Sequence, residues 1–186
     1  MKIAEKPITY HEFLEIDFPE NADLIYELLN GYIVKYNAPE PKHQFISANL
    51  HLIIGSYVKE KKLGRVLYAP ISVFLNEYNA PQPDLLFVSK KNESIIHDKG
   101  IVGVPDLIVE IISPGSIIRD RIEKKEIYEQ AGVKEYWIVD PKYKSIEVYE
   151  LSKEVYKLIS SAEENGTIRS KVIKNFAINI ETVFEP

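Results

Sequence analysis

Two segments of the chain are near-continuous apolar strands, and each of them opens with a Pro-Asp pair. They are QPDLLFV at residues 82–88 and PDLIVEII at residues 105–112. Unbroken apolar strands of this kind are normally buried on both faces of a sheet that helices cover. EYWIV at residues 135–139 has the same character. The chain is therefore expected to fold around a central sheet that lies in the interior.

The N-terminal part of the chain carries a hairpin signal. Asn30-Gly31 lies between the apolar runs LIYELL and YIVKY, and Asn-Gly in that setting favours a tight turn between antiparallel strands. We expect strands at about 25–29 and 32–36, although LIYELL by itself is also compatible with a helix. Thr9 and Glu12 form a capping-box pattern, which predicts a short helix that starts there.

The rest of the chain alternates between helical and extended patterns, which favours a mixed α/β or α+β domain. Apolar spacing predicts a long helix from 43 to 62 and a second helix from about 117 to 131, closed by Gly132. Further strands are expected at 65–69, 71–76, 145–151 and 155–159, with one more strand and a short tail in the last twenty residues.

Composition sets the outer limits of this interpretation. A chain of 186 residues fits one domain over residues 1–186, and 45% hydrophobic with 27% charged residues is an ordinary globular balance. No apolar run approaches the roughly 18 residues of a membrane span, and the start lacks an apolar signal segment, so a cytoplasmic protein without membrane contact is expected. Cysteine is absent, which excludes thiolate metal sites. The net charge of -5 means that contact with DNA would need a local basic patch or a metal ion.

Carboxylates lie inside the predicted strands. Glu110 is in the middle of LIVEII, where an unpaired carboxylate would cost several kcal/mol, so it is expected to be paired, protonated or metal-bound. A salt bridge near a strand end is the plain alternative. Asp106 lies about 13 Å up the same strand, too far to share a cation, so Asp84 on a neighbouring strand is the preferred partner. Glu27, just before the hairpin turn, is a third candidate, with a solvent-facing strand position as its alternative.

Lys124 lies on the apolar face of the helix predicted at 117–131. At 100° per residue, Ile117, Ile127, Tyr128 and Ala131 fall within about 60° of it. A lysine directed into the core needs an acidic partner or a function, and either a pair with Asp120 four residues earlier or a helix that lays Lys124 over Glu110 would supply one. Two carboxylates and a lysine suit phosphodiester hydrolysis, since carboxylates hold Mg²⁺ and a lysine stabilises the charge that grows on a phosphate.

The chain resembles the PD-(D/E)XK nuclease superfamily, and more closely the Uma-type family of restriction-endonuclease-like proteins. The resemblance rests on YELLNGYIV, QPDLLFV, PDLIVEIISPGS, RDRIEKKEIYEQAGV and EYWIVDP, in that order over most of the chain. Pro83-Asp84 matches the PD of the motif. Glu110 matches its second acid, but Ile112 stands where the motif has lysine.

The resemblance implies a restriction-endonuclease-like fold, with a central mixed sheet flanked by helices and the hairpin at the N-terminal end. It implies that Asp84 and Glu110 bind Mg²⁺ or Mn²⁺, that Glu27 completes the metal shell, and that Lys124 supplies the displaced lysine. His43 resembles a histidine of the family pattern. The substrate implied is nucleic acid, in particular DNA, and a homodimer is expected because cutting both strands needs two sites.

Two other functions stay open at this point. A catalytically inactive nuclease fold that serves as a binding or regulatory module would fit the acidic charge and the lysine missing from its usual place. A glycosidase could work with two carboxylates alone, although a buried lysine and a single Trp give it little support.

Overall fold

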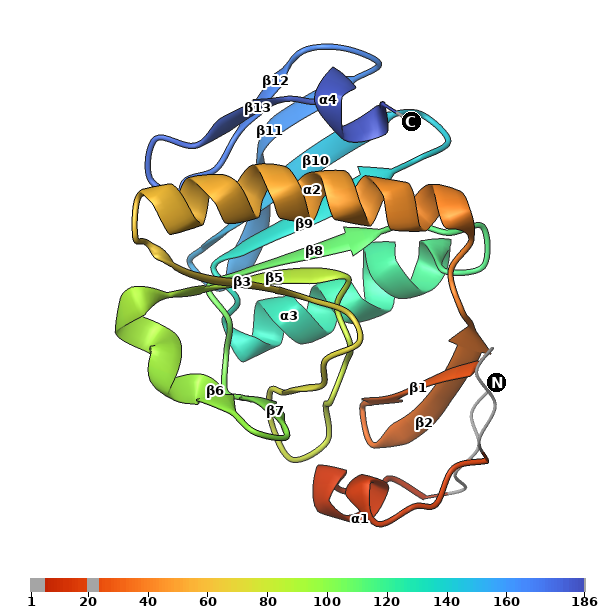
Figure 1. Ribbon diagram of the computed structural model, residues 1–186. Coiled ribbons are helices and arrows are strands. Elements are labelled where there is room, and N and C mark those ends of the chain that lie inside the picture. The colour runs from red at the N-terminus through yellow and green to blue at the C-terminus, as the bar shows by residue number, and fades with distance from the viewer. Residues whose placement is uncertain (1–5, 20–23, 186) are drawn as a thin grey trace.

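A six-stranded mixed sheet forms the centre of the molecule (Figure 1). The computed structural model describes residues 6–19 and 24–185. The sheet order is β11-β10-β9-β8-β5-β3, and only β8 and β9 run parallel, as the long crossover between them allows. The six strands are β3 (Gly64–Tyr68), β5 (Leu85–Ser89), β8 (Leu107–Ile111), β9 (Glu135–Asp140), β10 (Ser145–Ser152) and β11 (Val155–Glu163).

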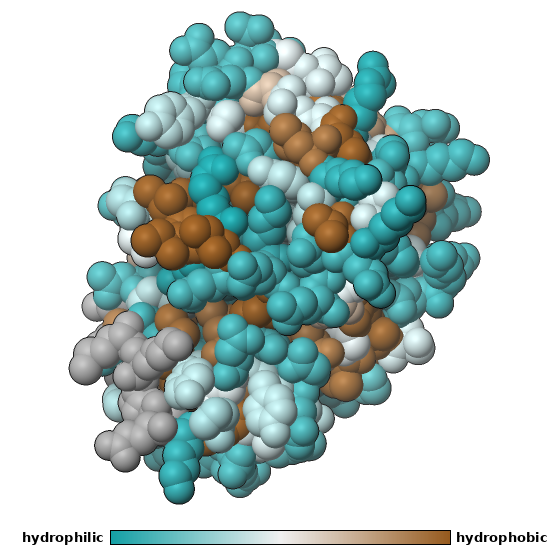
Figure 2. All heavy atoms as spheres, turned by 180° about the vertical axis from the view of Figure 1, so that it is seen from behind, coloured by the Kyte–Doolittle hydropathy of each residue, from teal (hydrophilic) through white to brown (hydrophobic). Residues whose placement is uncertain are grey.

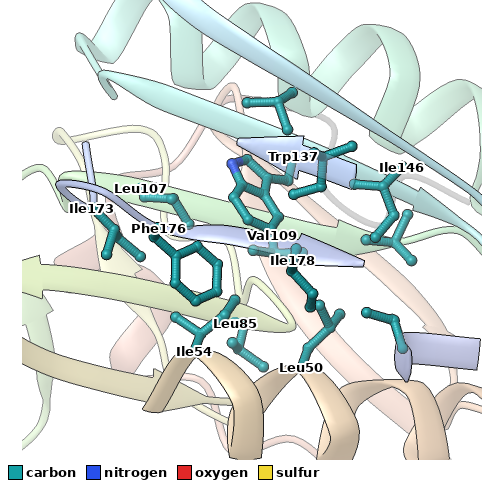
Figure 3. Packing of buried hydrophobic residues seen from close by; sticks show 14 of the residues in the cluster. Leu50, Ile54, Leu85, Leu107, Val109, Trp137, Ile146, Ile173, Phe176 and Ile178 are labelled. Carbon is teal, nitrogen blue, oxygen red and sulfur yellow. The ribbon is translucent and has the colours of Figure 1, made fainter. Parts of the chain in front are cut away.

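Helical segments cover both faces of this sheet. The long helix α2 (Pro41–Glu60) packs on one face, where its Leu50 and Ile54 meet Leu85 and Val109 (Figure 3). The other face carries the crossover between β8 and β9, formed by η2 (Arg119–Lys124) and α3 (Lys125–Ala131). Side chains along a strand alternate between faces, so the strands are buried on both sides, as the apolar runs predicted.

The N-terminal hairpin is confirmed. It consists of β1 (Leu24–Leu29) and β2 (Tyr32–Asn37), and its turn residues Asn30 and Gly31 both have positive φ angles, of 51° and 77°, which a two-residue hairpin turn requires. The helical alternative for LIYELL is thereby excluded. Backbone hydrogen bonds in both directions between Leu28 and Ala80 attach the hairpin to the segment that leads into β5. The predicted capping box opens α1 (Tyr10–Leu14).

Two predictions of short elements need correction. The strand expected at 71–76 is reduced to β4 (Val73–Phe74), part of a small sheet with β6 (Ile96–His97) and β7 (Gly100–Val102), which follow the helical turn η1 (Lys90–Ile95). The last twenty residues hold more than one strand and a tail. They form β13 (Ala177–Asn179), which pairs with β12 (Thr167–Arg169), and the short helix α4 (Glu181–Phe184). Elements of two to four residues are too short to leave a periodic pattern in the sequence.

The helix predicted at 117–131 also differs in its first part. Lys124, Ile127 and Tyr128 are buried as expected, but Ile117 is 47% exposed. The reason is that η2 is a π-helix, with hydrogen bonds between residues five apart, so the α-helical spacing of 100° per residue does not hold through it. No helix in the described residues is both long enough and apolar enough to cross a membrane. The face seen in Figure 2 is largely hydrophilic, with apolar side chains in separate patches.

Candidate active site

Glu110 and Lys124 form a buried ion pair at the centre of the molecule. Glu110 lies in β8 on the face that η2 and α3 cover, and Lys124 is the last residue of η2. The Lys124 Nζ lies 2.9 Å from Glu110 Oε1, and the Tyr128 hydroxyl donates to the same oxygen at 2.6 Å. Glu110 and Lys124 are 2% and 1% exposed. The sequence left Asp120 and Glu110 open as partners of Lys124, and the structure pairs Lys124 with Glu110.

Glu27 reaches the same lysine from the N-terminal hairpin. Its Oε1 lies 2.8 Å from Lys124 Nζ and accepts a hydrogen bond from the Gln82 backbone N–H at 2.6 Å. Its Oε2 is buried and has no hydrogen-bond partner among the described residues. Glu27 is completely buried, so the solvent-facing alternative is wrong: the hairpin packs against the body of the molecule through Leu28 and brings the adjacent carboxylate inside.

Asp84 stands beside Glu110, as the strand argument predicted. It directly precedes β5, and the register that pairs Leu85 with Val109 places it next to Glu110 in the ladder. Its Oδ2 accepts the Ile111 backbone N–H at 2.7 Å and lies 3.2 Å from His43 Nε2. His43 is in the first turn of α2 and is buried.

Three further side chains in this region were not assigned to the site from the sequence. Asp120 is buried one turn before Lys124, and the Arg119 Nε donates to its Oδ1 at 3.3 Å. The Arg119 guanidinium also lies over the ring of Tyr36, 3.9 Å from its centre. The four-residue spacing of Asp120 and Lys124 is a visible signal, whereas nothing in the sequence around Tyr36 points to the site.

Other candidates are held elsewhere. Asp106, the second Pro-Asp aspartate, accepts the Ser89 backbone N–H at 2.8 Å and pairs with Lys134 at the far end of β8, so its carboxylate is held by groups other than those around Glu110. The Arg121 guanidinium donates to Glu147 at 2.9 and 3.1 Å and lies 3.4 Å from an Asp140 oxygen. The side chain of Arg121 is therefore held by these two acids.

The site carries more negative than positive charge. The carboxyl groups are those of Glu27, Asp84, Glu110 and Asp120. The permanent cations beside them are Lys124 and Arg119, and His43 adds a third positive charge only when it is protonated. Several buried carboxylates close together disfavour each other's ionisation.

This imbalance is reflected in the pKa values. Burial raises the pKa of Glu110 well above its ordinary value, and the neighbouring carboxylates add to the rise, while Lys124 opposes it. For Lys124, burial acts against the charge, but Glu110 and Glu27 outweigh it and raise the pKa well above its ordinary value. Burial lowers the pKa of His43, yet Asp84 more than compensates and leaves it raised. The pKa values of Glu110, Lys124 and His43 thus all lie above their ordinary values.

Carboxylate oxygens are the donors that Mg²⁺ and Mn²⁺ prefer, so the donor set fits such a cation in kind, and the unpartnered Glu27 Oε2 is one oxygen with unused capacity. The arrangement is nevertheless that of an ion-pair network. Within residues 6–19 and 24–185, no group of three or more His, Cys, Asp or Glu side chains is gathered so as to hold a metal ion. The space between Glu27 and Glu110 is taken by the Lys124 ammonium group.

Comparisons with known proteins agree with this architecture. A crystal structure described as "a putative nuclease belonging to DUF820 from Anabaena variabilis ATCC 29413" superposes with a TM-score of 0.76 at 21% identity, over 96% of this chain and 98% of the other. At that identity the likeness shows the fold. A search of curated proteins gave no match. The Uma2 family model, described as "Putative restriction endonuclease", matches residues 10–181. That match includes Glu27, Asp84, Glu110 and Lys124, and the chain belongs to the Uma2 family of restriction-endonuclease-like proteins.

Proposed function

We propose that this protein is a metal-dependent endonuclease that hydrolyses phosphodiester bonds in DNA. The observation that carries the proposal is the meeting of Lys124 with Glu110 and Glu27, beside Asp84 on the next strand. These four residues come from four separate parts of the chain, and the family description supports a nuclease.

Asp84 and Glu110 are the residues proposed to hold Mg²⁺ or Mn²⁺, with Glu27 completing the set of carboxylates. When bound, such a cation supplies positive charge to the phosphate and lowers the pKa of a water molecule. Glu27 and Glu110 now share the ammonium group of Lys124, so their oxygens would have to serve both cations or release one. The excess negative charge of the cluster favours entry of a second cation.

Lys124 is proposed to replace the lysine that the PD-(D/E)XK motif would place at residue 112. Ile112 is buried in the apolar cluster with Ile108 and Tyr128, and the ammonium group arrives from η2 instead. Because the raised pKa of Lys124 keeps it protonated at neutral pH, we assign it to orienting the water and stabilising the charge on the phosphate, and not to accepting a proton.

The alternative is an inactive nuclease fold that binds a partner. Two observations favour it: Lys124 already pairs with two carboxylates, and no three-ligand metal group exists among the described residues. This alternative predicts that the protein has no affinity for Mn²⁺. A glycosidase is disfavoured, because Lys124 occupies the space between Glu27 and Glu110.

The test is nicking of supercoiled plasmid in Mg²⁺ and in Mn²⁺, with an EDTA control. Lys124→Ala should abolish cleavage, and Asp84→Asn should reduce it by at least about a hundredfold, a typical size for loss of a group that stabilises transition-state charge. Asp106→Asn, the aspartate of the second Pro-Asp pair, and Lys125→Ala are the matched controls and should retain activity.

Each outcome decides between the candidates. Cleavage that needs the metal and disappears in a Lys124→Ala variant that circular dichroism shows to be folded supports the proposed site, whereas cleavage that survives in Lys124→Ala removes it. If no cleavage occurs, calorimetric titration with Mn²⁺ separates the remaining cases: no binding favours the inactive module. Linear product formed without free nicked intermediate would support a homodimer with two sites, and sedimentation gives its mass independently.

A further inference from the structure

Arg119 is a cation at the site whose hydrogen-bonding capacity is only partly used. Its side chain is 14% exposed, its Nε donates to Asp120, and its guanidinium rests on the Tyr36 ring. Among the residues that the structure describes, neither of its two terminal nitrogens has a hydrogen-bond partner. A guanidinium group can bond two oxygens of one phosphate through parallel N–H groups, so Arg119 presents donors suited to that ligand.

The π-helix explains why Arg119 faces the acidic cluster. In an α-helix, residues five apart are about 140° apart around the axis. The i→i+5 hydrogen bonding of η2 brings Arg119 close to the face of Lys124. The charges agree with this placement: burial lowers the pKa of Arg119, but Asp120, Glu27 and other negative groups outweigh burial and raise it.

The neighbouring cationic side chains, Arg121 and Lys124, are less available to bind a substrate. Arg121, two residues later, is held by Glu147 and Asp140. Lys124 is almost completely buried and is occupied by two carboxylates. Arg119 thus combines partial exposure, free donors and proximity to the carboxylates.

We propose that Arg119 binds the phosphodiester group of the substrate beside the acidic cluster, and that Tyr36 and Asp120 hold its guanidinium group in position. The inference rests on the proposed function, since it takes a nucleic-acid phosphate as the ligand. The carboxylates alone would repel that phosphate. Arg119 offsets the repulsion, while Asp120 fixes one edge of the guanidinium group and Tyr36 supports its face by a cation–π contact.

The test measures binding without turnover. Fluorescence anisotropy of a labelled short DNA duplex, titrated with protein in Ca²⁺ at several salt concentrations, gives the affinity and its salt dependence, and a gel shows that the duplex stays intact. Arg119→Gln should weaken binding about tenfold, the size expected for a charge-assisted hydrogen bond. It should also lower the slope of log affinity against log salt by about 0.9, as expected for one lost phosphate contact.

Arg121→Gln is the matched control and should leave the salt slope unchanged. Arg119→Lys should keep the salt slope, because the positive charge remains. It should nevertheless lower the affinity, because an ammonium group lacks the two parallel N–H donors of a guanidinium group. For the positioning residue, Tyr36→Phe keeps the aromatic face and should bind like the wild type, whereas Tyr36→Leu should bind more weakly with an unchanged slope. Circular dichroism and thermal unfolding establish that each variant is folded.

Three results would overturn the proposal: an Arg119→Gln variant with wild-type affinity and slope, an equal loss of slope in Arg121→Gln, or a wild-type protein that does not bind the duplex. The proposed catalysis fails separately. A protein that binds DNA through Arg119 and does not nick plasmid supports this inference and contradicts the endonuclease.

Discussion

Two glutamates on neighbouring strands of the sheet, Glu135 and Glu110, are equally buried but very differently partnered. Glu135 accepts hydrogen bonds from Trp137 Nε1 at 2.7 Å and Ser170 Oγ at 2.6 Å, and from the backbone N–H groups of Lys171 and Val172 at 2.7 and 3.1 Å. Both of its oxygens are used, and every donor is an uncharged group.

Glu110 has a different set of partners. One of its oxygens accepts from Lys124 and Tyr128, and the other makes no hydrogen bond within the described part of the chain. Nearby, Glu27 Oε2 is buried and likewise has no hydrogen-bond partner among the described residues. A carboxylate saturated with neutral donors holds a fold together, whereas one with unused acceptor capacity and a charged partner can take part in binding or chemistry. Burial alone does not separate the two, but the list of donors does.

The largest effect is expected when the charged partner is removed. Lys124→Met leaves Glu110 and Glu27 buried without a counter-charge, so the free energy of unfolding should fall by about 3–5 kcal/mol at neutral pH. Urea denaturation measures this loss. Lys125→Met is the control, since Lys125 is partly exposed and contacts the Tyr149 ring. A loss below about 1 kcal/mol for Lys124→Met would show that the ion pair does not hold the cluster.

Making the same substitution, Glu to Gln, at both positions tests the difference between the two glutamates directly. Glu135→Gln places an NH₂ group against donors that have no other acceptor, and should lower the free energy of unfolding by about 2 kcal/mol. In Glu110→Gln the remaining oxygen still accepts from Lys124 and Tyr128, and the NH₂ group takes the place of the oxygen without a donor. That variant should stay within about 1 kcal/mol of the wild type and yet lose plasmid nicking. Equal losses of stability would remove the distinction between the two sites.

A smaller, pH-dependent effect is expected at His43. Asp84 raises the pKa of His43 in the folded state above that of the unfolded chain. The contribution of the pair to stability is therefore full below the unfolded pKa of about 6.5 and is lost as the pH rises through the folded value. The advantage of the wild type over His43→Gln should be larger at acidic than at alkaline pH, by about 1 kcal/mol. Urea unfolding at several pH values checks this, and a difference that grows with pH would contradict it.

Much of this architecture could be predicted from local patterns. The buried strands and the hairpin turn at Asn30-Gly31 follow from periodicity and turn chemistry. The cost of an isolated buried charge indicated that Lys124 has an acidic partner, and it left Glu110 and Asp120 as the candidates. The position of Asp84 beside Glu110 could be predicted because residues on adjacent strands can be neighbours, whereas residues four apart on one strand cannot.

The remainder depends on long-range packing. The burial of Glu27 is decided by the docking of its hairpin against Ala80, which no pattern within LIYELL encodes. The position of Arg119 depends on a π-helix, and a helical wheel assumes that such turns do not occur. Tyr36 takes part only because the guanidinium group of Arg119 reaches its ring.

The hairpin that carries Glu27 has a consequence for the order of folding. Glu27 and Lys124 are 97 residues apart in the sequence, about half of the length of the chain, and contacts between residues so far apart in sequence require a large loop to close. The sheet and its apolar layers can form from closer neighbours, but the acidic cluster is complete only when the first hairpin has docked on the later helix. A chain in which the hairpin has not docked therefore lacks the complete cluster.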